Sequence, residues 1–391
     1  MATLKNEQIK TIVNTAYNEM TGKTDIATPL DLSAFCDKGS NAITDDREKF
    51  TKALLGVLTR TIYTDSSYRS EYKDVFYEDS EKFGAIVQMI HAEMPDVIED
   101  SAWKDFTSGV TTVGQYTVYL PVVDNKLYNK STSWALPLTI SGEQMDTAFR
   151  NETELRSFVN YLFMCLDNKI AEHMENMNDE NRNNFIAEKI LYSQNPEAKG
   201  VHVFDLVKEY ALEKGLTTAT RNAMLNDREF LAWSSAKISE FTRYFKKQTS
   251  LFNTEQKVRF TPSDRLVCQI LGRFETKMTS IGYADTRHEE YIKLPLHETT
   301  PWWQASGDLS FDDISALHIK TSTGTVNTSG VVGLLCDKWA ILHTIRKNRV
   351  ASEYFDIENL THYEYQHRDS YMNNLTMNAI VFVMNDYNAT A

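Results

Sequence analysis

The sequence predicts an α+β fold, and three patterns support this prediction. Apolar residues over 152–193 repeat at the spacing of one long helix. The stretch 84–142 instead holds short runs of β-branched and aromatic residues separated by turn residues, as strands do. Apolar strand patterns return over 331–345 and 379–384, near the C-terminus. A long helix between two blocks of strands is typical of an α+β protein.

The composition is that of an ordered protein with a sizeable core. The chain has 391 residues, of which 42% are hydrophobic and 24% charged, and it contains few glycines and prolines. This length allows two compact domains, or one domain with long extensions. A net charge of −13 argues against a dedicated nucleic-acid binder, because phosphate contacts favour basic proteins. A container that encloses DNA without gripping it can still be acidic.

Cysteine usage and the N-terminal residues indicate a reducing compartment. Cys36, Cys165, Cys268 and Cys336 lie far apart and have no metal-binding spacing, so we expect buried free thiols. Residues 1–10 are polar and do not resemble a signal peptide. No run of about 18 apolar residues occurs, so no membrane span is expected. These features predict a protein that is made, and assembles, in a cytoplasm.

Residues 1–70 are predicted to be helical and peripheral. Apolar residues from Ile9 to Met20 share one helical face, and Thr21-Gly22 ends that helix. A second helix with its own apolar stripe is expected over 45–63. We expect these helices to form an arm that packs on something else.

The stretch 84–142 is predicted to be a long β-rich excursion. Strands are expected over 85–90, 115–123 and 134–140, with a turn at Asp124-Asn125-Lys126. A two-stranded ribbon cannot bury many aromatic side chains by itself, so those of the excursion need another surface, such as a neighbouring subunit. The Trp302-Trp303 pair beside a proline is a second candidate for such a contact. The predicted interface residues are Trp103, Phe106, Tyr116, Tyr119, Tyr128, Trp134, Trp302 and Trp303.

The strongest local prediction is the helix over 152–193. Asn151 is a good N-cap residue, and Glu154 follows at the spacing of a capping box. The helix would be about 60 Å long, and Pro196 would stop it. Asparagine is dense over 178–184, where helix propensity falls and a break is expected.

Residues 201–330 are predicted to form a separate α/β lobe. Helices are expected over 204–214, closed by Gly215, and over 227–247, with a buried strand over 265–271. Residues 281–310 are rich in loop residues.

A short helix is expected over 311–317. Beyond it, apolar runs at 331–336 and 339–345 flank Asp337-Lys338 and predict a tight hairpin. An extended aromatic stretch over 354–371 and a last buried strand over 379–384 end the chain.

No motif predicts catalysis, a cofactor or a metal ion. Gly22-Lys23-Thr24 matches only the end of a phosphate-binding loop, because Tyr17 stands where the loop needs a glycine. His362 and His367 lack the spacing of a zinc helix, and the acidic residues around Asp312 do not match a calcium loop. The sequence therefore assigns no catalytic, cofactor-binding or metal-binding residue.

Several short stretches carry a resemblance to a known family. They are Glu93 to Val97; Leu138 to Ile140 with Thr147 to Phe149 and Glu154 to Val159; Gly333 to Trp339; and the aromatic strand Tyr363–Tyr371 that leads into Asn378 to Phe382. With the order of parts, these stretches resemble the HK-97-like major capsid proteins of tailed phages. More closely, they resemble the major capsid proteins of phi-29-like short-tailed bacteriophages, or podophages. The likeness covers most of 75–385, and residues 286–310 have no counterpart.

The resemblance implies how the chain is divided. It assigns 1–83 to an N-terminal arm, 84–142 to an E-loop-like β excursion and 143–200 to the spine helix of a peripheral (P) domain. It further assigns 201–330 to an axial (A-like) α/β domain and 331–391 to return strands of the axial and peripheral domains.

The resemblance also implies a structural function. The subunit would self-assemble into the hexamers and pentamers of an icosahedral head that encloses double-stranded DNA without sequence-specific binding. Scaffold and portal proteins would be further partners, and the protein would belong to the virion after assembly in the host cytoplasm. The alternatives are an encapsulin-like nanocompartment shell, an α/β enzyme with a site near Trp302, and another virion part such as a portal or tail protein.

Overall fold

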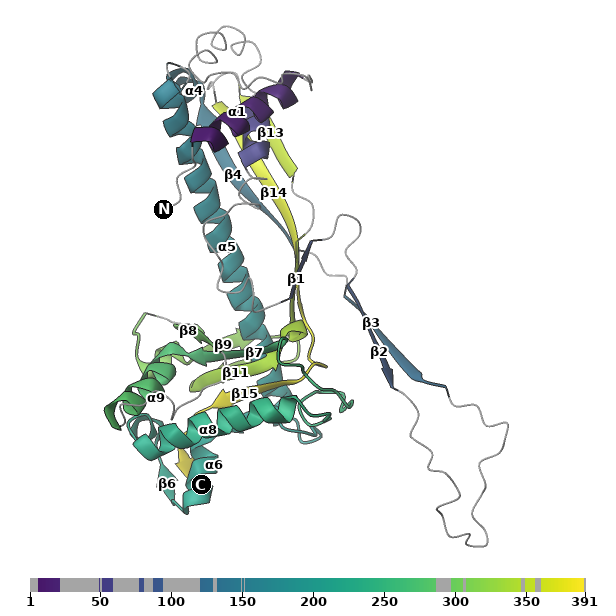
Figure 1. Cartoon of the computed structure of the whole chain (residues 1–391), viewed down its shortest axis with the longest axis vertical. Helices are drawn as coiled ribbons and strands as arrows, with labels where there is room; N and C mark the ends of the chain where they lie inside the picture. The colour runs from purple at the N-terminus through teal and green to yellow at the C-terminus, as the bar shows by residue number, and fades with distance from the viewer. Residues whose placement is uncertain are drawn as a thin grey trace.

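A long helix joins two lobes, and a β ribbon projects from the region between them (Figure 1). The computed structural model describes residues 6–21, 49, 51–58, 77–80, 87–93, 120–128, 132–148, 150, 152–285, 297–304, 307–345, 349–355 and 360–389. Each lobe has its own hydrophobic core. We call them the upper and lower lobes, from their positions in Figure 1.

Helix α5 (Glu152–Gln194) contributes to both cores and runs without interruption for 43 residues, or about 65 Å. The break expected in its asparagine-rich part is therefore wrong. Tertiary hydrogen bonds explain the continuity, because this part of the helix is buried between the lobes. The amide of Asn183 donates to the carbonyl of Trp303 at 2.8 Å, and that of Asn181 donates to the carbonyl of Leu342 at 3.5 Å.

The upper lobe packs α5 against strands β4 (Thr132–Ser141), β14 (Leu360–Asn373) and β13 (Arg349–Phe355). Both β4 and β13 pair antiparallel with β14. The short helix α4 (Gly142–Ala148) follows β4 and leads into α5. The predicted strand over 134–140 is thus confirmed, but it lies in the upper-lobe sheet and not in the projecting ribbon.

The N-terminal helices also belong to the upper lobe. Helix α1 (Asn6–Thr21) and the helical residues 51–58 bury their apolar faces in the same core as the first half of α5. Both predicted helices therefore exist within the described ranges. Their predicted role as an arm packed elsewhere is corrected for these residues, because Ile12, Leu54 and Leu58 are buried within their own chain.

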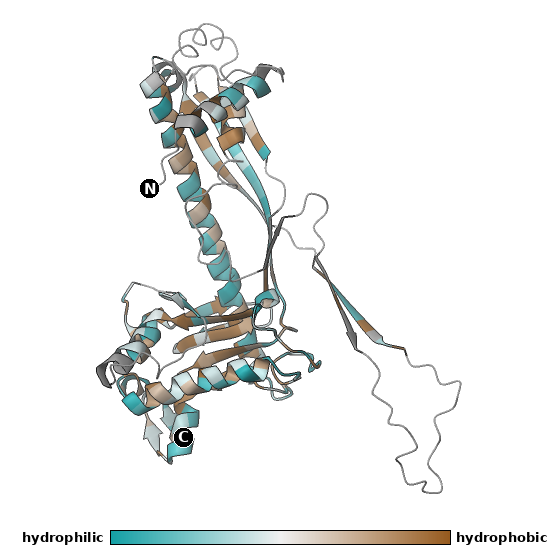
Figure 2. Ribbon diagram, viewed as in Figure 1, coloured by the Kyte–Doolittle hydropathy of each residue, from teal (hydrophilic) through white to brown (hydrophobic). Residues whose placement is uncertain are grey.

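The lower lobe is built on a five-stranded sheet in the order β5-β15-β11-β7-β8. Its strands are β5 (Val203–Asp205), β15 (Ala379–Val383), β11 (Val331–Asp337), β7 (Leu266–Leu271) and β8 (Glu298–Thr300). The three central strands are almost wholly buried, and Figure 2 shows them as a continuous hydrophobic layer. This burial explains why their sequences show apolar runs instead of alternation.

Helices cover the lower-lobe sheet as the sequence predicts. Helix α6 (Leu206–Lys214) starts at Asp205, whose carboxylate accepts from two backbone N–H groups, and ends at Gly215 with φ of 68°. Helix α8 (Arg228–Phe245) is capped by Asp227, whose carboxylate accepts from the backbone N–H of Glu229. The remaining elements of this lobe are β6 (Thr218–Ala219), α7 (Arg221–Met224), α9 (Gly272–Asp285), α10 (Phe311–Ile314), β9 (Leu317–Lys320), β10 (Thr325–Thr328) and β16 (Tyr387–Asn388).

The hairpin predicted over 331–345 is wrong. Strand β11 pairs with β7 and β15, whereas β12 (Ile341–Ile345) pairs with β14 and with β1 (Tyr77–Ser80) in the other large sheet. Between them, Asp337 caps the short 3-10 helix η2 (Lys338–Ala340) through the backbone N–H of Trp339. The chain therefore leaves one sheet and enters the other at this point.

The projecting ribbon consists of β2 (Val87–Glu93) and β3 (Val122–Tyr128), which pair antiparallel. The turn predicted at Asp124-Asn125-Lys126 is wrong, because these residues lie inside β3. Most of the predicted strand over 115–123 lies outside the described residues. None of the helices in the described ranges combines the length and apolar character that a membrane span needs.

Candidate subunit interface

The two faces of the β2–β3 ribbon differ in chemistry. Opposite residues of an antiparallel pair share a face, so the register places Ile90, Val123 and Leu127 together on one face. We call this the outer face. The exposed fractions of its apolar side chains are 65%, 59% and 60% respectively, and exposed Leu120 lies just before β3. Exposed Asn125 lies opposite Ile90 on this face, so the face is mostly but not wholly apolar, on an element that is too thin to bury it.

The inner face of the ribbon is charged and points toward the lower lobe. It carries Met89, Asp124 and Lys126. Asp124 forms an ion pair with Lys257, and Lys126 forms one with Glu255. The hydrogen bond from Lys257 lowers the pKa of Asp124 below its ordinary value. Burial opposes this direction for Glu255, but hydrogen bonds from both lysines still lower its pKa.

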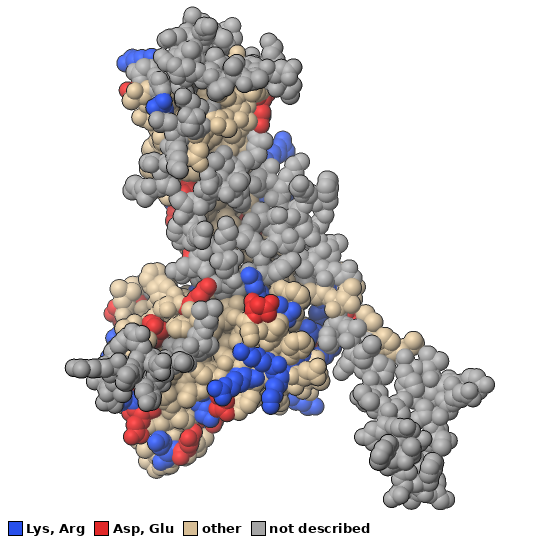
Figure 3. Space-filling view, viewed as in Figure 1, with Lys and Arg blue, Asp and Glu red and all other residues tan. Residues whose placement is uncertain are grey.

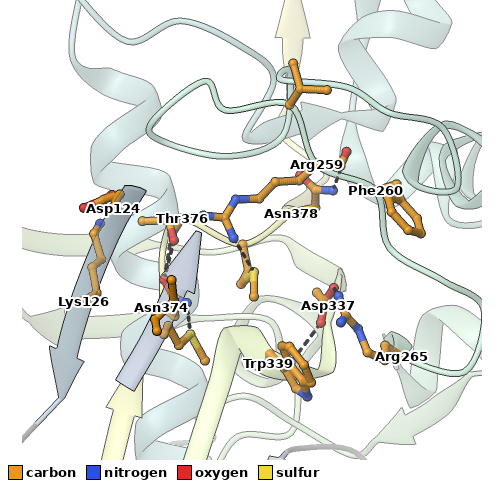
Figure 4. Close-up of a pocket in the computed structure, with 14 residues that line it drawn as sticks. Asp124, Lys126, Arg259, Phe260, Arg265, Asp337, Trp339, Asn374, Thr376 and Asn378 are labelled. Atoms are coloured by element: carbon orange, nitrogen blue, oxygen red, sulfur yellow. Dashed lines mark hydrogen bonds and ion pairs between the residues drawn. The ribbon is translucent and has the colours of Figure 1, made fainter. Parts of the chain in front are cut away.

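A cavity of about 420 Å³ lies between the ribbon and the lower lobe (Figure 4). Apolar and aromatic side chains, including Val258, Phe260 and Trp339, line its lower-lobe side. The guanidinium of Arg265 lies 4.1 Å from the ring centre of Trp339 and pairs with the buried carboxylate of Asp337 at 2.7 Å. The lower-lobe side of the cavity thus combines apolar surface with a partly buried ion pair.

Five of the eight predicted interface residues have no described side chain. Trp103, Phe106, Tyr116 and Tyr119 lie outside the described residues, and Tyr128 lies in β3 without a described side chain. The structure places Trp302 at the surface, with 46% of its side chain exposed. Trp302 therefore stays a candidate for a subunit contact.

Trp303 lies in the core of its own chain. It is 2% exposed, and its indole N–H donates to the carbonyl of Val331 at 2.9 Å. The guanidinium of the buried Arg182 lies 4.7 Å from its ring centre. Its role is to anchor the loop after β8 between α5 and β11, so we do not retain it among the expected interface residues. This burial also removes half of the Trp pair on which the alternative enzyme site depended.

Trp134 makes its described contacts within the upper lobe. Its indole N–H donates to Asp369 at 2.8 Å, and its ring lies 4.5 Å from that of His173 and 4.9 Å from that of His367. Asp369 is fully buried and also accepts from Nδ1 of His367 at 2.8 Å. Trp134, near the start of β4, is thus partly buried next to a carboxylate–histidine pair, and its expected subunit contact stays a prediction.

The outer face of the ribbon and its ion pairs are not evident from the sequence. Val123, Asp124, Asn125, Lys126 and Leu127 alternate between exposed and partly buried, which is the period-2 pattern of a strand. The run of Asp, Asn and Lys instead suggested a turn. The partners of these charges come from a loop about 130 residues away, and no local pattern reveals them.

Basic side chains gather over the lower lobe, where α8 lies (Figure 3). Arg243, Lys246 and Lys247 are exposed at the end of this helix and just after it. The negative end of a helix dipole favours such residues, which accounts for a local basic patch in an acidic chain. Among the residues that the structure describes, no three His, Cys, Asp or Glu side chains gather in a way that could hold a metal ion.

Solved structures of phage proteins share this fold. The chain is similar to a protein in the capsid structure of Staphylococcus phage Andhra, with a TM-score of 0.50 and 12% identity over 82% of this chain and 85% of the other. It is also similar to a protein in the structure of the head fiber and inner core protein gp22 of native bacteriophage P68. There the TM-score is 0.50 and the identity 11%, over 79% of this chain and 83% of the other. No curated protein sequence matches the chain.

The family match is more specific than these likenesses. The model of the Phi29-like phage major capsid protein matches residues 9–383. That range includes both lobes, α5 and the ribbon. Because the match spans nearly the whole chain, this protein belongs to the family of Phi29-like phage major capsid proteins and is a structural subunit of a phage capsid.

Proposed function

We propose that this chain forms the hexamers and pentamers of an icosahedral head that encloses double-stranded DNA, and that the outer face of its ribbon is a contact between subunits. The exposed apolar outer face carries the second part of the proposal. Ile90, Val123 and Leu127 share one face of an element that leaves the body of the molecule (Figure 1). Burial on a neighbouring copy would remove this apolar surface from water.

The exposed side of α5 in the upper lobe is a suitable partner surface. This side is mostly polar, with Lys169 and Glu172 paired at 2.7 Å, and it carries exposed Tyr161. A ribbon that lies across it would cover this tyrosine with apolar side chains and leave the paired charges at the rim. Such an apolar centre with a polar rim is the common anatomy of protein interfaces.

The charge of the chain fits a container for DNA. With a net charge of −13, the shell wall would repel the polymer overall and enclose it without sequence-specific contacts. The proposed function is structural and includes no catalytic role. We further propose that assembly takes place in the host cytoplasm and uses scaffold and portal proteins. A portal is expected because DNA needs an opening through which to enter a closed head.

The test replaces the three outer-face residues with lysine. We expect Ile90→Lys, Val123→Lys and Leu127→Lys in one chain to leave both lobes folded, because these side chains are exposed, and to abolish shells. Negative-stain electron microscopy of the chain, alone and with the neighbouring genes co-expressed, measures shell formation. Circular dichroism checks folding.

The matched control adds the same charge elsewhere. Leu212, Leu216 and Leu309 are exposed leucines of the lower lobe, and they lie outside the loop that pairs with the ribbon. Their replacement by lysine should leave shells intact. Normal shells from the ribbon variant would show that the outer face is not a subunit contact, whereas loss of shells in both variants would indicate a general charge effect. Nuclease-protected DNA in particles from infected cells tests the enclosed cargo.

A further inference from the structure

Four charged side chains join the ribbon to the lower lobe, and we call them the ribbon ion-pair cluster. Asp124 and Lys126 lie two residues apart on β3, and Glu255 and Lys257 lie two residues apart on the loop after α8. Lys257 pairs with Asp124, and Lys126 pairs with Glu255. Each segment thus contributes one acid and one lysine, and each lysine pairs with the acid of the other segment. Lys257 also lies 3.1 Å from the other oxygen of Glu255, which closes the cluster into a network.

The cluster is partly shielded from solvent. Its four side chains are 20% to 40% exposed, whereas those of the pair Lys169–Glu172 are 62% and 59% exposed. Isolated exposed pairs contribute little to stability, but networks of partly buried charges contribute more. Burial would lower the pKa of Lys257, yet the hydrogen bonds that it donates to Asp124 and Glu255 raise this pKa instead.

Among the described residues, few apolar contacts hold the ribbon against the lower lobe beside the ion-pair cluster. Met89 packs against the lower-lobe core, and its sulfur accepts from the side-chain amide of Asn374 at 2.8 Å. The outer face, by contrast, is exposed, and the cavity lies under the inner face beside Asp124 and Lys126 (Figure 4). The direction in which the ribbon points therefore depends largely on charge pairing.

We propose that the ribbon ion-pair cluster is a releasable clasp that holds the ribbon against the lower lobe of its own chain and so sets the direction in which its outer face is presented. Ion pairs are weakened by salt and by charge reversal, whereas apolar packing is not weakened by either in this way. Closure of the clasp is a property of the single chain. Only its consequence for assembly rests on the proposed subunit contact of the outer face.

Charge swaps test the clasp without a change in net charge. The ribbon swap is Asp124→Lys with Lys126→Glu, and the loop swap is Glu255→Lys with Lys257→Glu. Each swap alone places like charges opposite one another. The two swaps together restore the crossed pattern with every sign reversed. A swap of the exposed pair Lys214→Glu with Glu229→Lys is the matched control, because this pair joins α6 to α8 and belongs neither to the ribbon nor to the proposed partner surface on α5.

Spin labels report whether the clasp is open. One label replaces exposed Asn125 on the ribbon and the other replaces exposed Lys246 after α8, with Cys36 and Cys165 changed to serine. Cys268 and Cys336 can stay, because they are buried and burial raises the pKa of Cys268 to about 12. Double electron–electron resonance on the unassembled full chain then gives the distribution of distances between the labels.

We expect one narrow distance distribution for the parent, for the control swap and for the two swaps together. Either swap alone should give a broad distribution shifted to longer distances. The parent distribution should broaden in the same way between about 0.05 M and 1 M NaCl, as the screening length falls from over 10 Å to about 3 Å.

A narrow parental distribution in both single swaps would overturn the clasp, as would failure of the combined swap to restore it. If the single swaps do not fold, the salt series on the parent decides, and an unchanged distribution at 1 M NaCl overturns the clasp. Electron microscopy of the same variants separates the two proposals. An open ribbon with normal shells would support the clasp and contradict the subunit contact of the outer face.

Discussion

Lys189 places an amine in the core of the lower lobe. Its side chain has no exposed surface, and Nζ donates to the carbonyls of Phe252 at 3.3 Å and Leu375 at 3.1 Å. These bonds tie the end of α5 to two loops of the lobe. Burial disfavours the charged form and lowers the pKa of Lys189 to about 7.

The lowered pKa makes stability depend on pH. In the unfolded chain the amine stays protonated up to about pH 10.4. Between about pH 7 and pH 10 the unfolded state therefore binds more protons than the folded state, and the free energy of unfolding rises with pH. Below about pH 7 both states are protonated, and the cost of burying the charge is fully present.

The variant Lys189→Met should remove this dependence. Relative to the variant, the parent should gain on the order of 4 kcal/mol in free energy of unfolding between pH 7 and pH 10. Urea unfolding of the unassembled chain at several pH values measures the difference. The exposed Lys246→Met is the control, and it should follow the parent at every pH. A parallel course of parent and Lys189→Met would contradict the lowered pKa.

At the scale of elements, strand β14 connects the two lobes. It pairs with β4 up to Asp369 and with β12 from Asp369 onward, so this residue marks the change of partner. Burial alone would raise the pKa of Asp369, but the imidazoles of His343 and His367 outweigh it and hold the pKa well below its ordinary value. The depressed pKa means that this carboxylate stabilises the fold above about pH 4, and that its contribution is lost as the pH falls further.

Removal of this charge should weaken the sheet at the point where β14 changes partner. We expect Asp369→Asn to lower the free energy of unfolding by about 3 kcal/mol at pH 7, because its buried partners lose a charged acceptor. The difference should persist down to about pH 4 and narrow below it. Thermal unfolding between pH 3 and pH 7 tests this, with the exposed Asp308→Asn as the control. Equal melting temperatures of the two variants at pH 7 would refute the role of Asp369.

Local patterns predicted those elements whose causes are local. The caps Asp205, Asp227 and Gly215 fix helix ends through backbone bonds of their own segments, and the prediction of α6 and α8 is confirmed. The length of α5 is predicted by its apolar repeat for the same reason. Its expected break is wrong, because Asn183 bonds to a carbonyl 120 residues away.

Pairing between strands was predictable only in part. The apolar runs of β11 and β12 predict two buried strands, but the choice of partner depends on the sheets that surround them. Asp337 looks like a turn residue and instead caps a 3-10 helix, held there by Arg265 at 2.7 Å. The same holds for the ribbon, because its charged side chains pair with Glu255 and Lys257, which lie far from it in the sequence.

At the scale of the whole molecule, α5 is the main connection between two separate cores. Its apolar residues Leu155 to Ile170 belong to the upper core and Phe185 to Ile190 to the lower one. The stretch between them is more polar, so its rigidity comes from helical hydrogen bonds and from the buried contacts of Asn181 and Arg182. A shell requires subunits of fixed shape, and we expect the unbroken helix to provide it.

A proline in the middle of α5 tests this expectation. Asn176 is exposed, so Asn176→Pro removes no core contact, but it breaks the helical hydrogen-bond ladder at a cost of about 3 kcal/mol or more. We expect both lobes to stay folded and to unfold in two separate calorimetric transitions, and we expect shells to be lost. Glu152→Pro at the first position of α5 is the control, because proline is tolerated there. Shells of parental form from both variants would show that the connection through β14 alone fixes the angle between the lobes.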